Sequence, residues 1–168
     1  FGFIKKILGS KSDKDLKDLY PLVDDINIEF DKLKNISDDE LRNKTFEFKE
    51  IIQNNLNDSN QVIDSLREKY KKSDGSLSEK ENILNEIDSL KESQKEIIEK
   101  TLNELLPEAF AVVKETARRF TENESLEVTA SDFDRELASK KDNIEIDGSK
   151  AVWYNEWSAA GVDIKWNM

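Results

Sequence analysis

Two runs of mostly apolar residues recur at alternating steps of four and three, and they constrain the fold more than any other feature. This spacing places each run on one face of an α-helix. A turn is indicated between them at Ser73–Ser76, which contains Gly75. The sequence therefore predicts two helices packed as a long antiparallel hairpin. The first run is Ile52, Leu56, Ser59, Ile63, Leu66 and Tyr70, and the second is Ile83, Ile87, Leu90, Gln94, Ile97 and Thr101.

Most of the remaining chain is also expected to be helical, because its 168 residues include only 5 Gly and 2 Pro. A helix is expected over residues 14–18, and it either ends near Pro21 or continues to Lys34. Pro107 suits the first turn of a new helix over residues 108–120.

Two further helix starts carry the residue pattern of a capping box, in which a serine side chain and an acid three positions later bond each other's backbone amides. Ser37 with Glu40 begins one helix, and Ser131 with Asp134 begins a short helix through Leu137. The asparagine-rich stretch at residues 54–60 is a poor helix former, so a break in the first hairpin helix is an alternative there.

The C-terminal part alternates apolar and polar residues, as half-buried strands do. We expect a three-stranded antiparallel meander made of Asn143–Asp147, Lys150–Trp157 and Val162–Asn167, with a turn at Gly148. Leu126–Thr129 is a further candidate strand.

The expected fold class is thus mostly α, with a long antiparallel helical hairpin insertion and a small C-terminal three-stranded antiparallel β meander. The expected divisions are residues 1–36 (basic amphipathic helix and the next helix), 37–106 (hairpin region), 107–122 (one helix) and 123–168 (short helix and meander).

Composition excludes several classes of functional site. The chain has no His and no Cys, so a Cys/His zinc site, a disulfide, a thiol nucleophile and a Ser-His-Asp triad are all excluded. The net charge of −11 argues against nucleic-acid binding. No glycines have the spacing of a phosphate-binding loop, and no apolar run is long enough to span a bilayer. No catalytic, cofactor-binding or metal-binding residue is therefore expected.

Three weaker patterns have simpler explanations. Residues 143–148 resemble a calcium loop, but the position of the final Glu ligand is Tyr154. The acid clusters Asp24-Asp25 and Asp38-Asp39-Glu40 fit helix capping and solvation better than acid–base catalysis. The three tryptophans near the C-terminus could form a ligand platform, but filling a thin core explains them better.

The N-terminal segment is the candidate functional site. Its apolar residues share one helical arc flanked by lysines, so residues 1–11 carry +3 while residues 12–168 carry −14. This arrangement suits the surface of an anionic membrane. The alternative, that the arc packs on the chain's own helices, is equally supported by the residues alone. The predicted membrane- or channel-binding residues are Phe1, Phe3, Ile4, Lys5, Lys6, Ile7, Leu8 and Lys11.

Three segments resemble, in this order, the N-terminal region of SecA, the bacterial preprotein translocase ATPase. They are the basic start at residues 1–17, the segment from Ile36 to Lys49 (ISDDELRNKTFEFK), and the segment from Leu105 to Arg119, which opens LLPEAFAVVKE. The resemblance covers about residues 1–52 and 102–120. Residues 53–101 and 123–168 depart from the usual family pattern and are expected to be lineage-specific insertions.

The resemblance implies a motor that uses ATP, with Mg²⁺, to push unfolded preproteins through the SecYEG channel. It also implies that the N-terminal helix binds acidic lipids and that the protein lies in the bacterial cytoplasm, peripherally associated with the inner membrane. The chain ends before the Walker motifs, so this piece is expected to dock to membrane and channel, to bind no cofactor itself and to be inactive alone. The alternative function is a structural module whose hairpin binds a partner or forms a homodimer.

Overall fold

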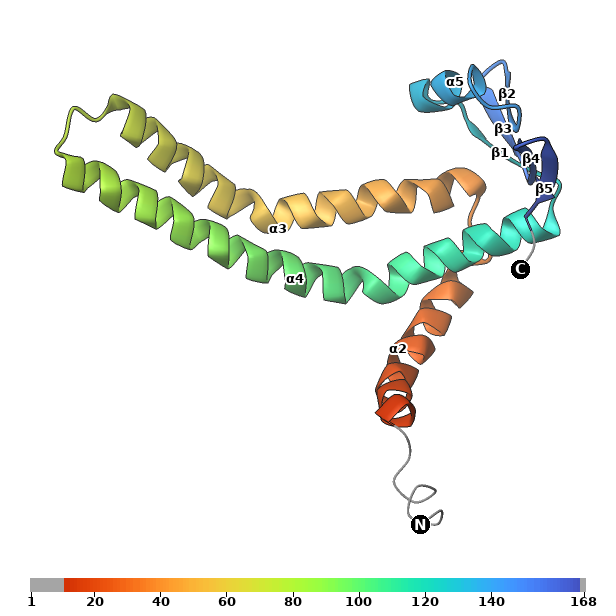
Figure 1. Cartoon of the computed structure of the whole chain (residues 1–168), viewed down its shortest axis with the longest axis horizontal. Helices are drawn as coiled ribbons and strands as arrows, with labels where there is room; N and C mark the ends of the chain where they lie inside the picture. The colour runs from red at the N-terminus through yellow and green to blue at the C-terminus, as the bar shows by residue number, and fades with distance from the viewer. Residues whose placement is uncertain (1–10, 167–168) are drawn as a thin grey trace, which may run out of the picture. The chain divides into compact units, whose positions relative to one another are not determined.

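The computed structural model describes the backbone of residues 11–166, and side chains from Lys17 onward except that of Asp18. Helices dominate, and a small antiparallel β part follows them (Figure 1), which confirms the expected fold class. In chain order the elements are α2 (Lys11–Leu33), α3 (Asp38–Lys72), α4 (Leu77–Glu122), β1 (Ser125–Thr129), α5 (Asp132–Ala138), β2 (Ile144–Asp147), β3 (Lys150–Tyr154), β4 (Glu156–Ala159) and β5 (Val162–Lys165).

The chain divides into two compact units. Unit 1 combines residues 1–44 with residues 107–168, and unit 2 is the continuous stretch 45–106. Helices α3 and α4 each contribute to both units. Each unit has its own apolar cluster, so each is described by itself.

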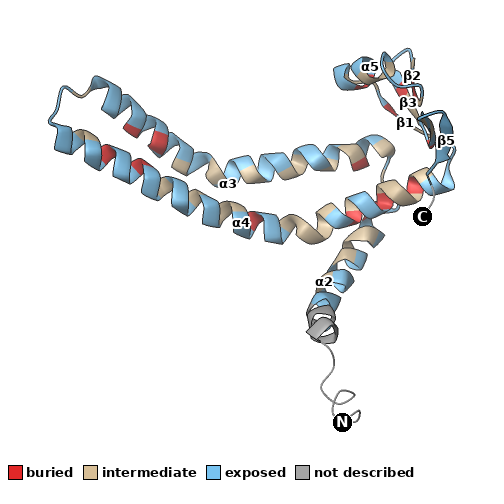
Figure 2. Ribbon diagram, viewed as in Figure 1, coloured by how far each residue is buried: buried red, intermediate tan, exposed pale blue. Residues whose placement is uncertain are grey.

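Unit 2 is built on the two runs of apolar residues that the sequence singles out. Ile63 and Leu66 of α3 pack against Ile83 and Ile87 of α4, and Leu90 covers the cluster. Figure 2 shows the buried positions of this unit on the two helices. Because residue numbers rise along α3 as those of their partners fall along α4, the two segments run antiparallel.

The polar interruptions of the two runs lie opposite each other. The Gln94 side-chain amide donates to the Ser59 hydroxyl at 2.6 Å and to the side-chain oxygen Oδ1 of Asn60 at 2.7 Å. The Asn55 amide donates to the Thr101 hydroxyl at 2.9 Å. The Ser59 and Thr101 hydroxyls in turn donate to carbonyls of their own helices, those of Leu56 and Ile97. The asparagine-rich stretch is therefore bonded to α4 while it remains helical, and α3 does not break.

Both prolines lie inside helices. Helix α2 continues through Pro21 to Leu33, which settles the alternative left open by the sequence. The expectation that Pro107 begins a new helix is wrong, because α4 runs through it. Proline removes one helical hydrogen bond, and buried residues on both sides, Thr101 and Ala111, hold α4 in place despite that loss.

The core of unit 1 lies where the end of α2, the start of α3 and the end of α4 meet. Leu33, Leu41 and Ala111 are buried there. Partly buried residues surround them, namely Ile26, Phe30, Ile36 and Val112.

The strands form two sheets rather than one meander. The three-stranded antiparallel sheet has the order β1-β3-β2, and β4 pairs with β5 in a second sheet. The candidate strand at Leu126–Thr129 is therefore the third member of the sheet, in place of Val162–Asn167. The expected strand Lys150–Trp157 is two strands that meet at the buried Asn155. The backbone amide of Asn155 donates to the Glu124 carbonyl beside β1, and its carbonyl accepts from the Trp166 amide beside β5, so the chain passes from one sheet to the other here. The side-chain amide of Asn155 donates to the Phe120 and Asn123 carbonyls.

The stability of unit 2 should depend on its buried cluster. Replacing the buried Ile87 by alanine should lower the free energy of unfolding by about 2–5 kcal/mol, because it leaves a cavity in the cluster. Leu84 lies one turn earlier on α4 and is 45% exposed, so Leu84→Ala is the matched control, with an expected loss of about 1 kcal/mol or less. Urea unfolding of both variants measures the difference, and equal losses would contradict the described pairing.

Candidate functional site

The residues predicted to bind membrane lie almost wholly outside the described part of the chain. Residues 1–8 are not described, and Lys11 is known only as the backbone start of α2. Among the described residues there is no group of His, Cys, Asp or Glu that could hold a metal ion, and no helix there is long and apolar enough to cross a membrane.

The most developed polar site of the described chain surrounds the first turn of α3. The predicted capping box is present: the Glu40 amide donates to the Ser37 hydroxyl at 3.2 Å, and the Ser37 amide donates to the Glu40 carboxylate at 2.7 Å. The hydrogen bonds from Ser37 lower the pKa of Glu40. This turn then contacts three other elements of unit 1, and we call the set of contacts the α3 junction.

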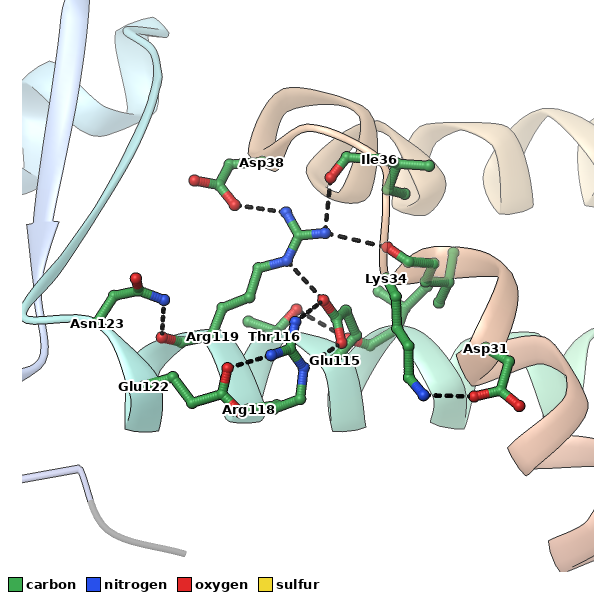
Figure 3. A network of polar contacts seen from close by, with 12 residues as sticks. Asp31, Lys34, Ile36, Asp38, Glu115, Thr116, Arg118, Arg119, Glu122 and Asn123 are labelled. Carbon is green, nitrogen blue, oxygen red and sulfur yellow. Dashed lines mark hydrogen bonds and ion pairs between the residues drawn. The ribbon is translucent and has the colours of Figure 1, made fainter.

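Arg119 of α4 is the centre of the α3 junction (Figure 3). Its guanidinium is buried and donates to the Glu115 carboxylate at 2.8 Å and to the Asp38 carboxylate at 2.5 Å. It also donates to the carbonyls of Leu33 and Ile36, at 3.1 and 2.7 Å. This one side chain thus bonds the last carbonyl of α2, a carbonyl of the segment that connects α2 to α3, and the carboxylate at the start of α3.

Glu115 is the buried counter-charge of this arginine. Its side chain is inaccessible to solvent, and Arg118 also donates to both carboxylate oxygens, at 2.8 and 2.7 Å. Burial by itself raises the pKa of Glu115, but the hydrogen bonds and charges of the two arginines outweigh it and lower that pKa. The carboxylate therefore stays ionised near neutral pH.

The other acids of the α3 junction contact the β part of unit 1. Asp39 accepts from the Thr129 amide at 2.8 Å and from its hydroxyl at 2.7 Å. Arg42 donates to both oxygens of the buried Asp134, at 2.8 and 2.9 Å. Asp134 also completes the predicted capping box of α5 with Ser131. The start of α3 is thereby bonded to β1 and to α5.

These groups satisfy one another, and no buried polar side-chain atom of the described residues lacks a hydrogen-bond partner. The described contacts of the α3 junction hold the end of α2, α4, β1 and α5 around the first turn of α3. The sequence explained Asp38 and Asp39 by capping and solvation alone, and it missed Arg42, Glu115 and Arg119. A signal existed: Glu115 and Arg119 follow Ala111 at steps of four, on the buried face of α4.

Removing the central arginine should destabilise the fold. Arg119→Met leaves Asp38 and two carbonyls without their donor, so we expect the free energy of unfolding to fall by about 3–5 kcal/mol. Arg118→Met is the matched control, because Glu115 then keeps Arg119, and its loss should be less than half as large. Urea unfolding measures both, and similar losses would refute the central position of Arg119.

The contribution of Asp134 should depend on pH. Burial raises its pKa, but hydrogen bonds from Arg42 and Ser131 outweigh this and lower the pKa from 3.8 to about 2. Because this pKa is lower in the folded state than in the unfolded chain, the ionised carboxylate stabilises the folded state at any pH above about 4. This stabilisation is lost as the pH falls from about 4 to about 2. The stability difference between the parent chain and Asp134→Asn should therefore shrink over this range in urea titrations. A difference independent of pH would contradict the ion pair.

Comparison with known proteins identifies the family. The model of the SecA DEAD-like domain matches residues 4–131. Curated relatives called protein translocase subunit SecA are similar along almost the whole chain: 43% identity in Bacteroides fragilis, 42% in Phocaeicola vulgatus and 44% in Cytophaga hutchinsonii. No solved structure matches the chain.

The alignments extend over nearly the whole of this chain but over a small part of each relative. Each alignment covers 99% of this chain, so these relatives carry counterparts of residues 53–101 and 123–168, the stretches expected from the sequence to be insertions. The chain spans only about 15% of the length of each relative. The sequence resemblance is thus confirmed, and the chain belongs to the SecA DEAD-like domain family.

Proposed function

We propose that this chain is the N-terminal part of a SecA-type protein translocase subunit, and that its residues 1–11 dock the protein to anionic membrane beside the translocation channel. Family membership supports the first statement. The charge distribution supports the second, because the segment has three lysines and no acid in an otherwise acidic chain.

The physical chemistry of the segment fits reversible docking. Each lysine near an anionic surface contributes about 1 kcal/mol, so Lys5, Lys6 and Lys11 together contribute about 3 kcal/mol. Insertion of two phenylalanines and three aliphatic residues adds apolar burial. The body of the chain, at −14, is repelled by the same surface. Binding should therefore depend on the N-terminal segment.

In the whole protein, we propose, the docked subunit uses ATP with Mg²⁺ to drive unfolded preproteins through SecYEG. The relatives' name, protein translocase subunit, supports transport as the activity. The role of the described piece in that cycle is to present the N-terminal segment and to connect it to the motor. The α3 junction serves this role by fixing the end of α2 to α3 and α4.

A second candidate function concerns unit 2, which forms a compact unit of its own and exposes Val62, Leu77 and Leu84. In this second proposal, these exposed apolar side chains contact a partner or a second copy of the chain. Sedimentation equilibrium tests the dimer, and a monomer at all accessible concentrations removes that version of the alternative.

Vesicle co-sedimentation tests the docking proposal. The full chain should bind vesicles of phosphatidylglycerol, and it should bind zwitterionic phosphatidylcholine vesicles far less. Replacing Lys5, Lys6 and Lys11 by glutamine should weaken binding to the anionic vesicles about a hundredfold, the equivalent of about 3 kcal/mol. Deleting residues 1–11 should abolish it.

The matched control replaces three lysines of α4, Lys91, Lys95 and Lys100, by glutamine. These side chains are exposed, and replacing them changes the net charge as much as replacing Lys5, Lys6 and Lys11 does. Binding to the anionic vesicles should nevertheless be unaffected. Unchanged binding after the deletion, or equal losses in the two triple variants, would overturn the docking proposal.

A further inference from the structure

The last part of α4 carries two rows of side chains on opposite sides of the helix. Ala111, Glu115 and Arg119 are buried, and they face the core of unit 1 and the α3 junction. A second row recurs at steps of three, four and three, and it lies on the other side because successive helical residues are about 100° apart. We call this second row the outer stripe, and it consists of Phe110, Val113, Ala117 and Phe120.

The outer stripe is poorly covered by the described residues. Phe110 is 54% exposed and Val113 is 67% exposed. The apolar cluster described for unit 1 includes Ala111 and Val112 and no residue of the outer stripe. A surface helix has one apolar side, whereas a helix with apolar residues all round is buried in its protein. The outer stripe therefore requires a cover that residues 11–166 do not supply.

The apolar surface continues from the outer stripe onto β5. The ring centroid of Phe120 lies 6.3 Å from that of Trp166. The Trp166 amide donates to the Asn155 carbonyl at 2.8 Å, which extends the β4-β5 ladder by one residue. Alternate residues of a strand share a face, so Trp166 lies with Ile164 and Val162, and all three are exposed. A two-stranded ribbon is at best marginally stable by itself, so this face also requires a cover.

The charges beside the outer stripe are already paired. The Lys114 ammonium donates to the Asn27 side-chain oxygen at 2.7 Å. The Arg118 guanidinium donates to the carboxylates of Glu115 and Glu122 (Figure 3). A charged ligand would find no free partner in these groups, so the surface offers mainly the burial of apolar area. This favours an apolar polypeptide segment over the headgroups of a lipid surface.

The length of the relatives indicates which segment covers the surface. The chain spans only about 15% of each relative, so most of such a subunit lies outside the aligned region. A segment of the same polypeptide is tethered, and its effective concentration is on the order of 1 mM. It therefore occupies the surface in preference to a separate partner or a second copy of equal intrinsic affinity.

We propose that the outer stripe of α4 and the apolar face of β5 and Trp166 form one packing surface for the rest of the translocase subunit. The occupant is an apolar segment of the same polypeptide, from outside residues 1–168. This inference rests on the proposed function, in that the chain is taken as the N-terminal part of a longer SecA-type subunit. It does not depend on membrane docking.

A joined polypeptide tests the packing surface. It consists of this chain followed by the part of the Bacteroides fragilis subunit that lies beyond the aligned region, and it is compared with the chain alone. Hydroxyl-radical footprinting read by mass spectrometry reports how far each phenylalanine ring is exposed. Phe133 of α5 is the matched reference, because it is 59% exposed in the same unit and lies between two aspartates.

Joining should lower the labelling of Phe110 at least fivefold and leave that of Phe133 unchanged. Val113→Asp in the joined polypeptide should restore the labelling of Phe110, because a buried, unpaired carboxylate opposes apolar packing. Phe133→Asp should not restore it. Both replaced side chains are exposed in the chain, so its fold should survive both changes, which circular dichroism checks.

ATP turnover by the joined polypeptide separates this inference from the proposed function. Turnover with Phe110 labelled as strongly as in the chain alone would overturn the packing surface and leave the proposed function standing. Protection of Phe110 without turnover would support the packing surface and contradict the motor, and absence of both would contradict both. Labelling of Phe110 in the chain alone that falls as its concentration rises would assign the surface to a second copy, and it would also overturn the proposal.

Discussion

The described fold of unit 1 depends on one buried guanidinium. Arg119 joins the last carbonyl of α2, the connecting segment and the first acid of α3 to a helix more than 80 residues further along the chain. A buried arginine is tolerated only where its charge and donors are matched. Glu115 supplies the charge and Arg118 shares it, so the three side chains form one network with Asp38.

The same turn of α3 organises the β part, through Asp39 on Thr129 and Arg42 on Asp134. The described residues of the C-terminal stretch, 123–166, are therefore bonded into unit 1. The relatives share this stretch, which agrees with its integration.

Local patterns predicted local structure well. Both capping boxes, the two apolar runs and the turn between them depend on residues a few positions apart, and all are present. Pairings between residues far apart in the sequence were harder to predict. Leu126 and Ile144 both pair with Trp153, and alternation alone could not show that β1 would take the place of β5. The break at Asn155 depends on carbonyls of the α4 end, which no strand pattern reveals. The α3 junction escaped prediction for the same reason, because the partners of Arg119 on α2 and α3 are far away in sequence.

The functional account rests on a division of charge, with a short basic segment followed by an acidic body. Because the chain has no cysteine, a single nitroxide can be attached at one introduced thiol, which makes the central claim directly measurable. A label at Ile7→Cys should become more accessible to oxygen and less accessible to a polar relaxing agent when anionic vesicles are added. A label at Leu84→Cys should not change. Unchanged accessibility at position 7 with vesicles present would contradict membrane docking by the N-terminal segment.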